Sequence, residues 1–228
     1  MRIGKICILT MILVIGITCR SEAFILINEI LADPPQGIAG DANNDGKTSS
    51  SQDEFIELYN DGSDAVNLSG WSLEDALKLR HEFPSGSLMN PNAIWVVFGG
   101  GSPDLPGIHW QIASTGTLSL NNSSDTVILK DQKGHVIDRI EYGKEAGQDQ
   151  SLSRSPEGED TALIQHSLLP GAEGQPYSAG YFVNSDQVIP DEPENPEVPE
   201  PMSLFLLGLG LTLLMPLGKS RIIRRVLM

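Results

Sequence analysis

The residues with the clearest chemical pattern form one acidic loop. Asp41, Asn43 and Asp45 alternate along the chain, and Gly46 follows them directly. In a calcium loop, oxygen ligands stand at positions 1, 3 and 5, a glycine at position 6 allows a sharp turn, and position 7 offers its backbone carbonyl. The chain therefore offers seven candidate ligands for Ca²⁺: Asp41, Asn43, Asp45, Lys47, Ser49, Asp53 and Glu54.

The second half of this loop departs from the calcium pattern. Position 12 is normally a glutamate that binds through both oxygens, but Gln52 stands there, followed by Asp53 and Glu54. A bulge of one or two residues would bring either carboxylate to the ion, although no EF-hand helices flank the loop. Asn, Asp and Gly also favour ordinary solvated turns. Two interpretations stay open: a Ca²⁺ site that orders the loop without catalysing a reaction, or a polar turn without an ion.

Nucleophilic catalysis has little support in the sequence. The four histidines are scattered, none at the spacing of paired metal ligands, and the serines include no Gly-x-Ser-x-Gly turn. Gly99, Gly100 and Gly101 follow an apolar run but lack the lysine of a phosphate-binding loop, so they predict a flexible hairpin. His81 and Glu82 are expected as a surface pair. We therefore expect a protein that is not an enzyme and has no catalytic residues.

Aromatic residues suggest one binding alternative. Aromatic rings with a polar edge are common at binding surfaces, and a sugar-stacking patch would arise if the fold gathered five of them: His109, Trp110, Tyr177, Tyr181 and Phe182. Single exposed aromatic residues are common, so this patch is the weaker expectation.

Short strands must position these residues. Five segments have strong strand character: Ile25–Leu31, Glu54–Asn60, Ile94–Phe98, Thr126–Leu129 and Val136–Tyr142. Three are weaker: Leu68–Leu73, Leu79–Phe83 and Leu118–Leu120. Alternation puts Phe55, Glu57 and Tyr59 on one face and Ile56 and Leu58 on the other. Turn-forming residues separate the segments, and no amphipathic helix of useful length is present, so the pattern predicts an all-β sandwich or barrel.

Charge and cysteine usage restrict the partners. Residues 24–201 contain 29 acidic and eight basic side chains, a formal charge of −21. No basic surface for nucleic acid is expected, whereas cations are attracted. Both cysteines, Cys7 and Cys19, precede this region. The mature protein is therefore expected to lack disulfides and thiolate metal sites, so its fold depends on core packing.

The first residues have the pattern of an export signal. Arg2 and Lys5 precede an apolar stretch, residues 6–17, and Ser21-Glu22-Ala23 fits the small-x-small rule for cleavage. We expect signal peptidase to cut after Ala23, so that the mature chain begins at Phe24.

The last residues combine three features in order. Pro199, Glu200 and Pro201 precede an uncharged stretch, residues 202–217, which is at the short limit of the roughly 17–25 residues that span a bilayer as a helix. Arginines then follow at positions that would hold the tail on the cytoplasmic side: Arg221, Arg224 and Arg225.

This tail resembles the PEP-CTERM sorting signal of Gram-negative bacteria. The resemblance implies export, transient retention in the inner membrane by the C-terminal helix, and processing by an exosortase near Pro199–Pro201. A permanent single-pass anchor that is never cut is the alternative.

The central region resembles the lamin tail domain, an immunoglobulin-like β-sandwich. The residues that carry this resemblance are 27–34, 53–60 and 68–73, with 118–122 and 134–138 also fitting. The resemblance implies that Trp71 anchors the core between the sheets, and that Asn28 and Glu57 bind backbone groups within the sandwich. In nuclear lamins the domain is a protein-interaction platform, so the resemblance implies a fold and not a reaction.

These observations define five segments: a signal peptide (1–23), an immunoglobulin-like sandwich (24–155), a turn-rich extension (156–187), a Pro/Glu-rich spacer (188–201), and a transmembrane helix with a basic tail (202–228). The expected function is that of a non-catalytic exported protein of the cell surface or biofilm matrix, with exopolysaccharide or a surface protein as its candidate partner. A carbohydrate- or protein-binding adhesin and a calcium-dependent hydrolase are the alternatives.

Overall fold

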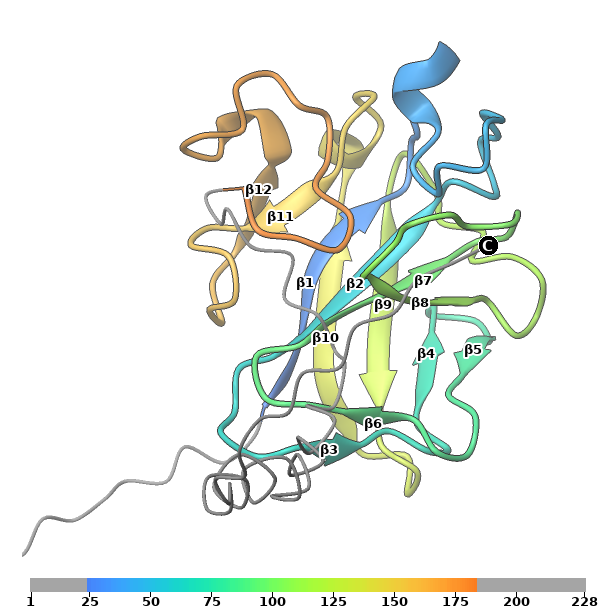
Figure 1. The fold of residues 1–228 in the computed structure, drawn as a ribbon, viewed down its shortest axis with the longest axis vertical. Helices are drawn as coiled ribbons and strands as arrows, with labels where there is room; N and C mark the ends of the chain where they lie inside the picture. Colours follow the sequence, from blue (N-terminus) through green and yellow to red (C-terminus); the bar gives the residue numbers. More distant parts are fainter. Residues whose placement is uncertain (1–23, 184–228) are drawn as a thin grey trace, which may run out of the picture. The chain divides into compact units, whose positions relative to one another are not determined.

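The computed structural model describes residues 24–183, which form an all-β fold (Figure 1). The described helices are three short 3₁₀ turns: η1 (Gly37–Gly40), η2 (Lys144–Ala146) and η3 (His166–Leu168). None of the helices in this range is long and apolar enough to span a bilayer. The predicted signal peptide, the Pro/Glu-rich spacer, the sorting motif and the C-terminal helix lie outside the described residues.

The large sheet has six strands, in the order β12-β11-β1-β2-β7-β8. Their bounds are β1 (Ile25–Leu31), β2 (Phe55–Asn60), β7 (Ile94–Phe98), β8 (His109–Ile112), β11 (Leu152–Arg154) and β12 (Leu163–Gln165). Neighbours are antiparallel except for β7 and β8, which are parallel. Because β1 lies between β2 and β11, the first strand pairs with residues more than 120 positions later.

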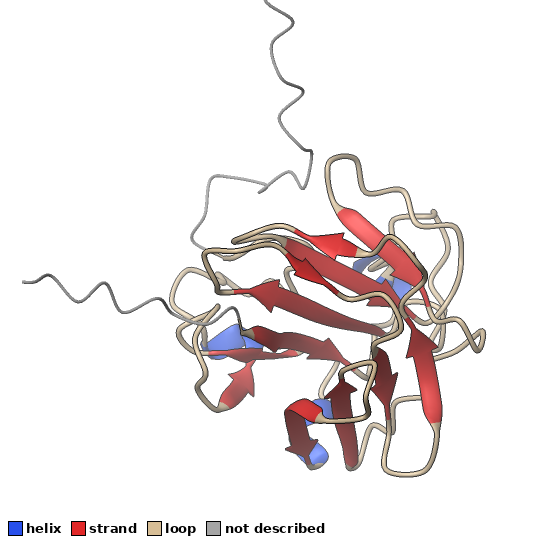
Figure 2. Ribbon diagram, turned by 90° about the horizontal axis from the view of Figure 1, so that it is seen from below, coloured by secondary structure: helices blue, strands red, loops and turns tan. Residues whose placement is uncertain are grey.

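The small sheet has four strands, in the order β10-β9-β4-β5. Their bounds are β4 (Ser72–Glu74), β5 (Leu79–Glu82), β9 (Asp125–Lys130) and β10 (Val136–Tyr142). A separate short pair consists of β3 (Val66–Asn67) and β6 (Leu88–Met89). Figure 2 shows the strands arranged in layers, as expected for a sandwich.

The main core lies between the two sheets. On β2, Ile56 and Leu58 enter this core, whereas Phe55 faces the opposite side of the sheet, which confirms the predicted alternation. Trp95 is buried in the core with 2% of its surface exposed. Trp71 was expected to be the anchor, but it is only partly buried and packs against the margin of the core.

The outer face of the large sheet is covered as well. A second apolar cluster contains Phe55, Val96 and Phe98 from the sheet, together with Ala42 and Ala179 from two covering segments. Every residue of β1 and β7 is therefore buried. The covering segments are the loop that follows β1 and the chain that follows β12.

Two expected strands differ from the structure for local reasons, and one observed strand was not expected. The predicted strand Leu68–Leu73 is interrupted by a turn, in which the Trp71 N–H donates to the Leu68 carbonyl and Gly70 has a φ of 75°. Leu118–Leu120 forms no strand, because Ser119 has a φ of 50°. Strand β8 was not predicted, since a four-residue segment with polar residues at alternate positions gives only a weak strand signal.

Candidate functional site

The acidic loop is held by its own side chains. The Asp41 carboxylate accepts hydrogen bonds from the backbone N–H groups of Asp45 (3.1 Å) and Gly46 (2.9 Å). Asn43 Oδ1 accepts a second bond from the Asp45 N–H, at 3.0 Å. Gly46 has a φ of 83°, which is the left-handed turn that favours glycine. The calcium-like sequence thus folds into a turn stabilised by carboxylate-to-backbone bonds.

Asp53 joins this loop, whereas Glu54 does not. The Asp53 carboxylate accepts bonds from Asn43 N–H (3.1 Å) and Ser49 N–H (2.7 Å). Burial raises its pKa, and the nearby Asp41 and Asp45 carboxylates raise it further. Glu54 faces the other way, where its Oε2 accepts a bond from Leu120 N–H at 3.3 Å. Four candidate ligands therefore lie together in the loop: Asp41, Asn43, Asp45 and Asp53. Glu54 lies apart from them.

The oxygen atoms of the loop are turned toward backbone N–H groups. Lys47 contributes its N–H to Asp45 Oδ1, at 3.0 Å. Within residues 24–183, no three His, Cys, Asp or Glu side chains are arranged to hold a metal ion. Calcium binding by Asp41, Asn43, Asp45 and Asp53 stays a prediction, and it requires these side chains to turn inward from the positions they have here.

The three consecutive glycines support this loop. Asn43 Nδ2 donates to the Gly100 carbonyl at 3.2 Å, and Ser102 N–H donates to Asp45 Oδ2 at 3.1 Å. A Cβ atom on Gly99 would lie 1.9 Å from the backbone oxygen of Ser51. These glycines therefore allow two backbones to approach closely, where the sequence predicted a flexible hairpin.

Two buried glutamates form a second polar cluster, on the outer face of the large sheet. Glu29 accepts bonds from Ser178 N–H (3.0 Å) and Ser178 Oγ (2.8 Å), and also from Ser151 Oγ. Glu57 Oε2 accepts a bond from Gly180 N–H at 2.7 Å. Both glutamates are fully buried. Burial raises the pKa of Glu29 to about 7, and burial together with the neighbouring Glu29 raises the pKa of Glu57 well above its usual range.

Asn28 and Glu57 bind backbone groups, as predicted, but the prediction that these groups lie within the sandwich is wrong. Asn28 Nδ2 donates to Glu57 Oε1 at 2.8 Å, and Asn28 Oδ1 accepts a bond from Gly158 N–H at 2.8 Å. The backbone groups bound are Gly158 and Gly180, in the C-terminal extension and not within the sandwich. The available signal was a glutamate within each of two strands that are rich in apolar residues, β1 and β2.

A serine, a histidine and a glutamate meet inside this cluster. Ser153 Oγ lies 2.9 Å from His166 Nδ1, and Glu29 Oε1 lies 3.5 Å from the same nitrogen. These are the residue types of a catalytic triad, but both partners share one ring nitrogen and all three residues are fully buried. Burial lowers the pKa of His166 to about 4, so the ring is neutral. The arrangement is part of the protein interior and is closed to a substrate.

The five aromatic residues of the predicted patch do not form one surface. His109 stacks on Trp95 with ring centroids 3.7 Å apart, Tyr177 packs edge-on against Phe55, and Phe182 packs on Tyr59. Trp110 keeps 36% of its surface exposed and borders a shallow groove between β8 and β5. His81, expected on the surface, is instead 2% exposed and bonds to Gln111 at 2.9 Å.

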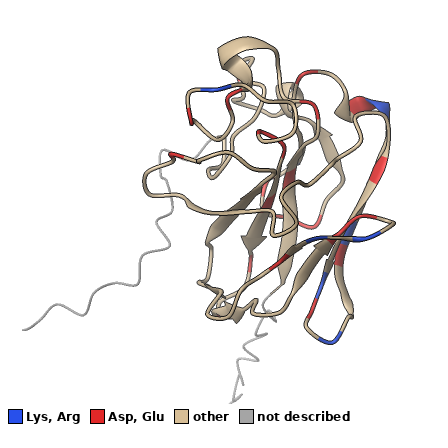
Figure 3. Ribbon diagram, turned by 90° about the vertical axis from the view of Figure 1, so that its right-hand side faces the viewer, with Lys and Arg blue, Asp and Glu red and all other residues tan. Residues whose placement is uncertain are grey.

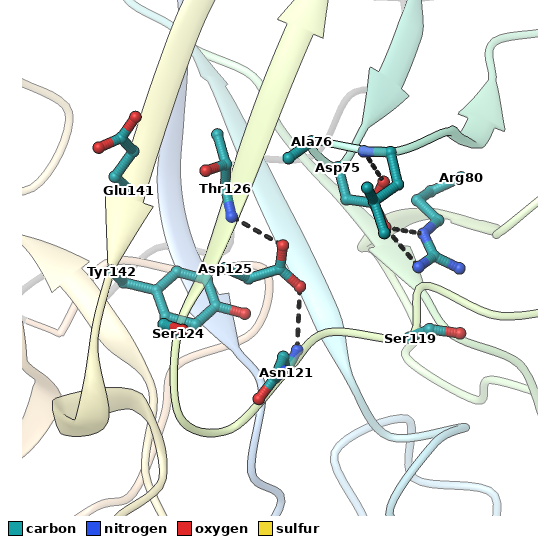
Figure 4. Close-up of a pocket in the computed structure, with 11 residues that line it drawn as sticks. Asp75, Ala76, Arg80, Ser119, Asn121, Ser124, Asp125, Thr126, Glu141 and Tyr142 are labelled. Atoms are coloured by element: carbon teal, nitrogen blue, oxygen red, sulfur yellow. Dashed lines mark hydrogen bonds and ion pairs between the residues drawn. The ribbon is translucent and has the colours of Figure 1, made fainter.

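A polar pocket of about 500 Å³ lies at one end of the small sheet (Figure 4). The turn between β4 and β5 contributes Asp75 and Leu77, and β5 contributes Arg80. The start of β9 contributes Asp125, and the end of β10 contributes Tyr142. Arg80 is 8% exposed and forms a two-pronged ion pair with Asp75.

The surroundings of this pocket are acidic, in keeping with the rest of the domain, where basic side chains are sparse (Figure 3). Asp125 Oδ1 accepts the Thr126 N–H at 2.7 Å, and its Oδ2 accepts the Asn121 N–H at 3.1 Å. Burial raises the pKa of nearby Glu54 to about 7, opposed by backbone N–H groups and by Arg80. Sequence patterns gave no signal for this pocket, because its residues come from four separate segments.

Comparison with known proteins identifies the family of this domain. No curated protein matches the chain. The family model of the lamin tail domain matches residues 20–144, more than half of the chain. That family is a group of non-catalytic, immunoglobulin-like domains, in agreement with the two-sheet architecture and with the near absence of helix in the described residues. The chain therefore belongs to the lamin tail domain family.

Proposed function

We propose that this protein is a non-catalytic, exported protein of the cell surface or extracellular matrix, in which the lamin tail domain serves a structural or interaction role. The observation that carries the proposal is the family match over residues 20–144. The buried ionisable side chains support a non-catalytic role, because Glu29, Glu57 and His166 form hydrogen bonds that hold segments of the fold together.

Export and sorting form the second part of this proposal, and they rest on the sequence. The pattern of residues 1–23 supports cleavage by signal peptidase, and residues 199–228 support recognition by an exosortase. The spacer of residues 188–201 is too rich in Pro and Glu to build a core, so it would separate the domain from the membrane or matrix.

The intact mass of the protein from its native host tests this part, with inner membrane, outer fractions and matrix kept apart. Sorting predicts a chain that begins at Phe24, ends near Pro201 and lies outside the inner membrane. A mass that retains residues 202–228 in the inner membrane would mean a permanently tethered domain and would reject exosortase processing.

A carbohydrate- or protein-binding adhesin is the second candidate function. Two observations favour it: the groove beside Trp110 at the free edge of β8, and the polar pocket beneath Tyr142. A calcium-dependent hydrolase has less support, because Asp53 and Glu54 bond to opposite neighbours and do not converge on one cleft.

A further inference from the structure

The last described residues, 177–183, lie on the outer face of the large sheet as a strap. They form no strand or helix. Three glutamates from three separate segments hold the backbone of the strap: Glu29 on β1, Glu57 on β2 and Glu157 in the turn between β11 and β12. They accept bonds, in that order, from the N–H groups of Ser178 (3.0 Å), Gly180 (2.7 Å) and Val183 (2.8 Å). Carboxyl groups therefore take the place that a neighbouring strand would have as hydrogen-bond partner.

The strap also covers aromatic side chains on this face. Tyr177 packs edge-on against Phe55, with ring centroids 6.0 Å apart, and Phe182 packs on Tyr59 at 5.0 Å. Phe55 and Tyr59 are both on β2, on either side of Glu57 in the alternation. The closed strap thus covers the outer face of β2, and an open strap would uncover it.

None of the described lysines and arginines forms an ion pair with these three glutamates. Arg154, on β11, pairs with two aspartates instead. His166 Nδ1 lies 3.5 Å from Glu29 Oε1, but its ring is neutral because burial lowers its pKa to about 4. The other ionisable groups that face the cluster are Tyr177 and Tyr181, and burial raises both of their pKa values. The carboxyl groups are therefore the ones that change charge near neutral pH.

Their protonation affects how well the strap is held. An ionised carboxylate without a cation is costly to bury, and a second one nearby adds repulsion. Glu29 and Glu57 are fully buried, and Glu157 Oε1 is buried without a hydrogen-bond partner among the described residues. Burial raises the pKa of Glu29 from 4.5 to about 7, and burial together with Glu29 raises the pKa of Glu57 well above its usual range. The stabilisation of the closed strap from Glu29 is thus full below about pH 4.5 and is lost as the pH rises through 7.

We propose that residues 177–183 are a pH-sensitive strap, controlled by the ionisation of these three glutamates, which opens more often as the pH rises through neutrality while both sheets stay folded. The Pro176 carbonyl accepts the Ser151 N–H at 2.9 Å, so the chain before the strap stays attached beside β11 when the strap opens. The strap depends on contacts within residues 24–183, so it is tested independently of export and sorting.

Hydrogen exchange measured by mass spectrometry on the purified full chain tests the proposal at pH 6, 7, 8 and 9, in detergent because the sequence has two apolar segments. Exchange times are scaled to the intrinsic exchange rate at each pH. We expect protection of residues 177–183 to fall at least about tenfold from pH 6 to pH 9, which is the factor for Glu29 with a pKa of about 7. Protection of β9 should stay constant. Constant protection of the strap, or an equal fall in β9, would overturn the proposal.

Glu29→Gln combined with Glu57→Gln separates the charges from the hydrogen bonds. Glutamine cannot ionise, but it keeps an oxygen that accepts the N–H groups of the strap. Most of the fall in strap protection should therefore disappear in this double variant. The matched control is Glu82→Gln combined with Glu141→Gln, which removes two charges from exposed positions on the small sheet and should keep the wild-type fall. A full fall in the buried double variant would reject the role of these carboxyl groups.

Glu157→Gln provides a second test, because this side chain is only partly buried and the substitution leaves Glu29 and Glu57 with their donors. The strap should stay closed at pH 6, and the fall in its protection by pH 9 should be smaller than in wild type. An unchanged fall would contradict control by the three glutamates together.

Discussion

Ionisable residues buried among apolar neighbours are the most unusual individual residues of this domain. An ionised carboxylate is costly to bury unless donors surround it. Glu29 meets this requirement with Ser151 and Ser178, and Glu57 meets it with Asn28 and Gly180. Burial nevertheless raises both pKa values, so the protonated forms are favoured in the folded state.

This pKa shift predicts a stability effect with a definite sign. Burial raises the pKa of Glu29 from 4.5 to about 7, so the folded state binds this proton more tightly than the unfolded state. The stability from Glu29 is full below about pH 4.5 and is lost as the pH rises through 7. Glu29→Gln cannot ionise, so its free energy of unfolding relative to wild type should improve by about 2–3 kcal/mol from pH 5 to pH 8.

Urea unfolding at pH 5, 6, 7 and 8 measures this difference. His81 and His166, whose pKa values burial lowers, destabilise the folded state as the pH falls, so the difference between variant and wild type must be used and not the raw curve. Glu82→Gln, at an exposed position, is the control and should show no pH-dependent difference. A constant difference for Glu29→Gln across the range would contradict the prediction.

The buried roles of individual residues were partly predictable from the sequence. The family resemblance indicated that Asn28 and Glu57 bind backbone groups, but it gave no role to Glu29. The partners of Asn28 and Glu57 were not predictable, since Gly158 and Gly180 lie more than 120 residues away from the side chains they bind.

Among the elements, the acidic loop and the glycine segment after β7 form one interlocked unit. The loop rests on Gly99–Gly101, and Asp104 N–H donates to the Asn43 carbonyl at 2.9 Å. This contact fixes the chain between β1 and β2 against the chain between β7 and β8. The close backbone approach explains why glycine is required at particular positions.

Gly99→Ala should destabilise the domain strongly. Its Cβ would lie 1.9 Å from the Ser51 carbonyl oxygen, and backbone must move to relieve the overlap. We expect a loss of about 3 kcal/mol or more, above the usual range for overpacking. Gly100→Ala is the matched control, because the nearest atom to its Cβ would be in the flexible Gln52 side chain, at 3.2 Å. Thermal unfolding should separate the two variants, and equal Tm values would refute the close-approach explanation.

Calcium binding by the same loop predicts a ligand-dependent stability. If the side chains of Asp41, Asn43, Asp45 and Asp53 turn toward an ion, the Tm should be higher in CaCl₂ than in EDTA. At a Ca²⁺ concentration 100 times the Kd, the free energy of unfolding should increase by about 2.7 kcal/mol. Asp45→Asn should reduce this shift, and Asp61→Asn, at an exposed turn, should not. An identical Tm in CaCl₂ and EDTA would support the interpretation as a polar turn.

The elements themselves were predictable where apolar residues were dense. The segments at β1, β2, β7, β9 and β10 matched the structure closely, because hydrophobic alternation or a continuous apolar run determines a buried strand. The strand β12 was missed, since three residues with half-buried side chains carry little pattern. Leu118 and Leu120 were misread as a strand because both are buried, although the backbone between them turns.

The whole domain extends beyond the segment that matches the family. Residues 145–183 supply β11 and β12, which complete one side of the large sheet, and they supply four donors to the buried glutamates. Arg154, in β11, also donates from Nε to the Ile27 carbonyl at 2.9 Å and pairs with Asp138 at 2.8 Å. The turn-rich sequence after residue 155 gave little indication that it packs on the sheet.

Shortened chains test whether this extension is required for folding. A chain of residues 24–183 should unfold cooperatively, whereas residues 24–144 should not fold stably. Each lost bond to a carboxylate is worth roughly 1.5–3 kcal/mol, so the loss of four is comparable with the roughly 5–15 kcal/mol total stability of a domain. Near-UV circular dichroism and thermal unfolding would measure the difference.

A third chain, residues 24–175, separates the two contributions of the extension. It keeps β11, β12 and the Ser151 donor, but it loses the three donors from Ser178 and Gly180. If buried carboxylates create the requirement, this chain should be unstable, and Glu29→Gln with Glu57→Gln should restore part of its stability by removing the charges left without donors. If strand pairing creates the requirement, the chain of residues 24–175 should unfold at nearly the Tm of residues 24–183, and the double substitution should give no recovery.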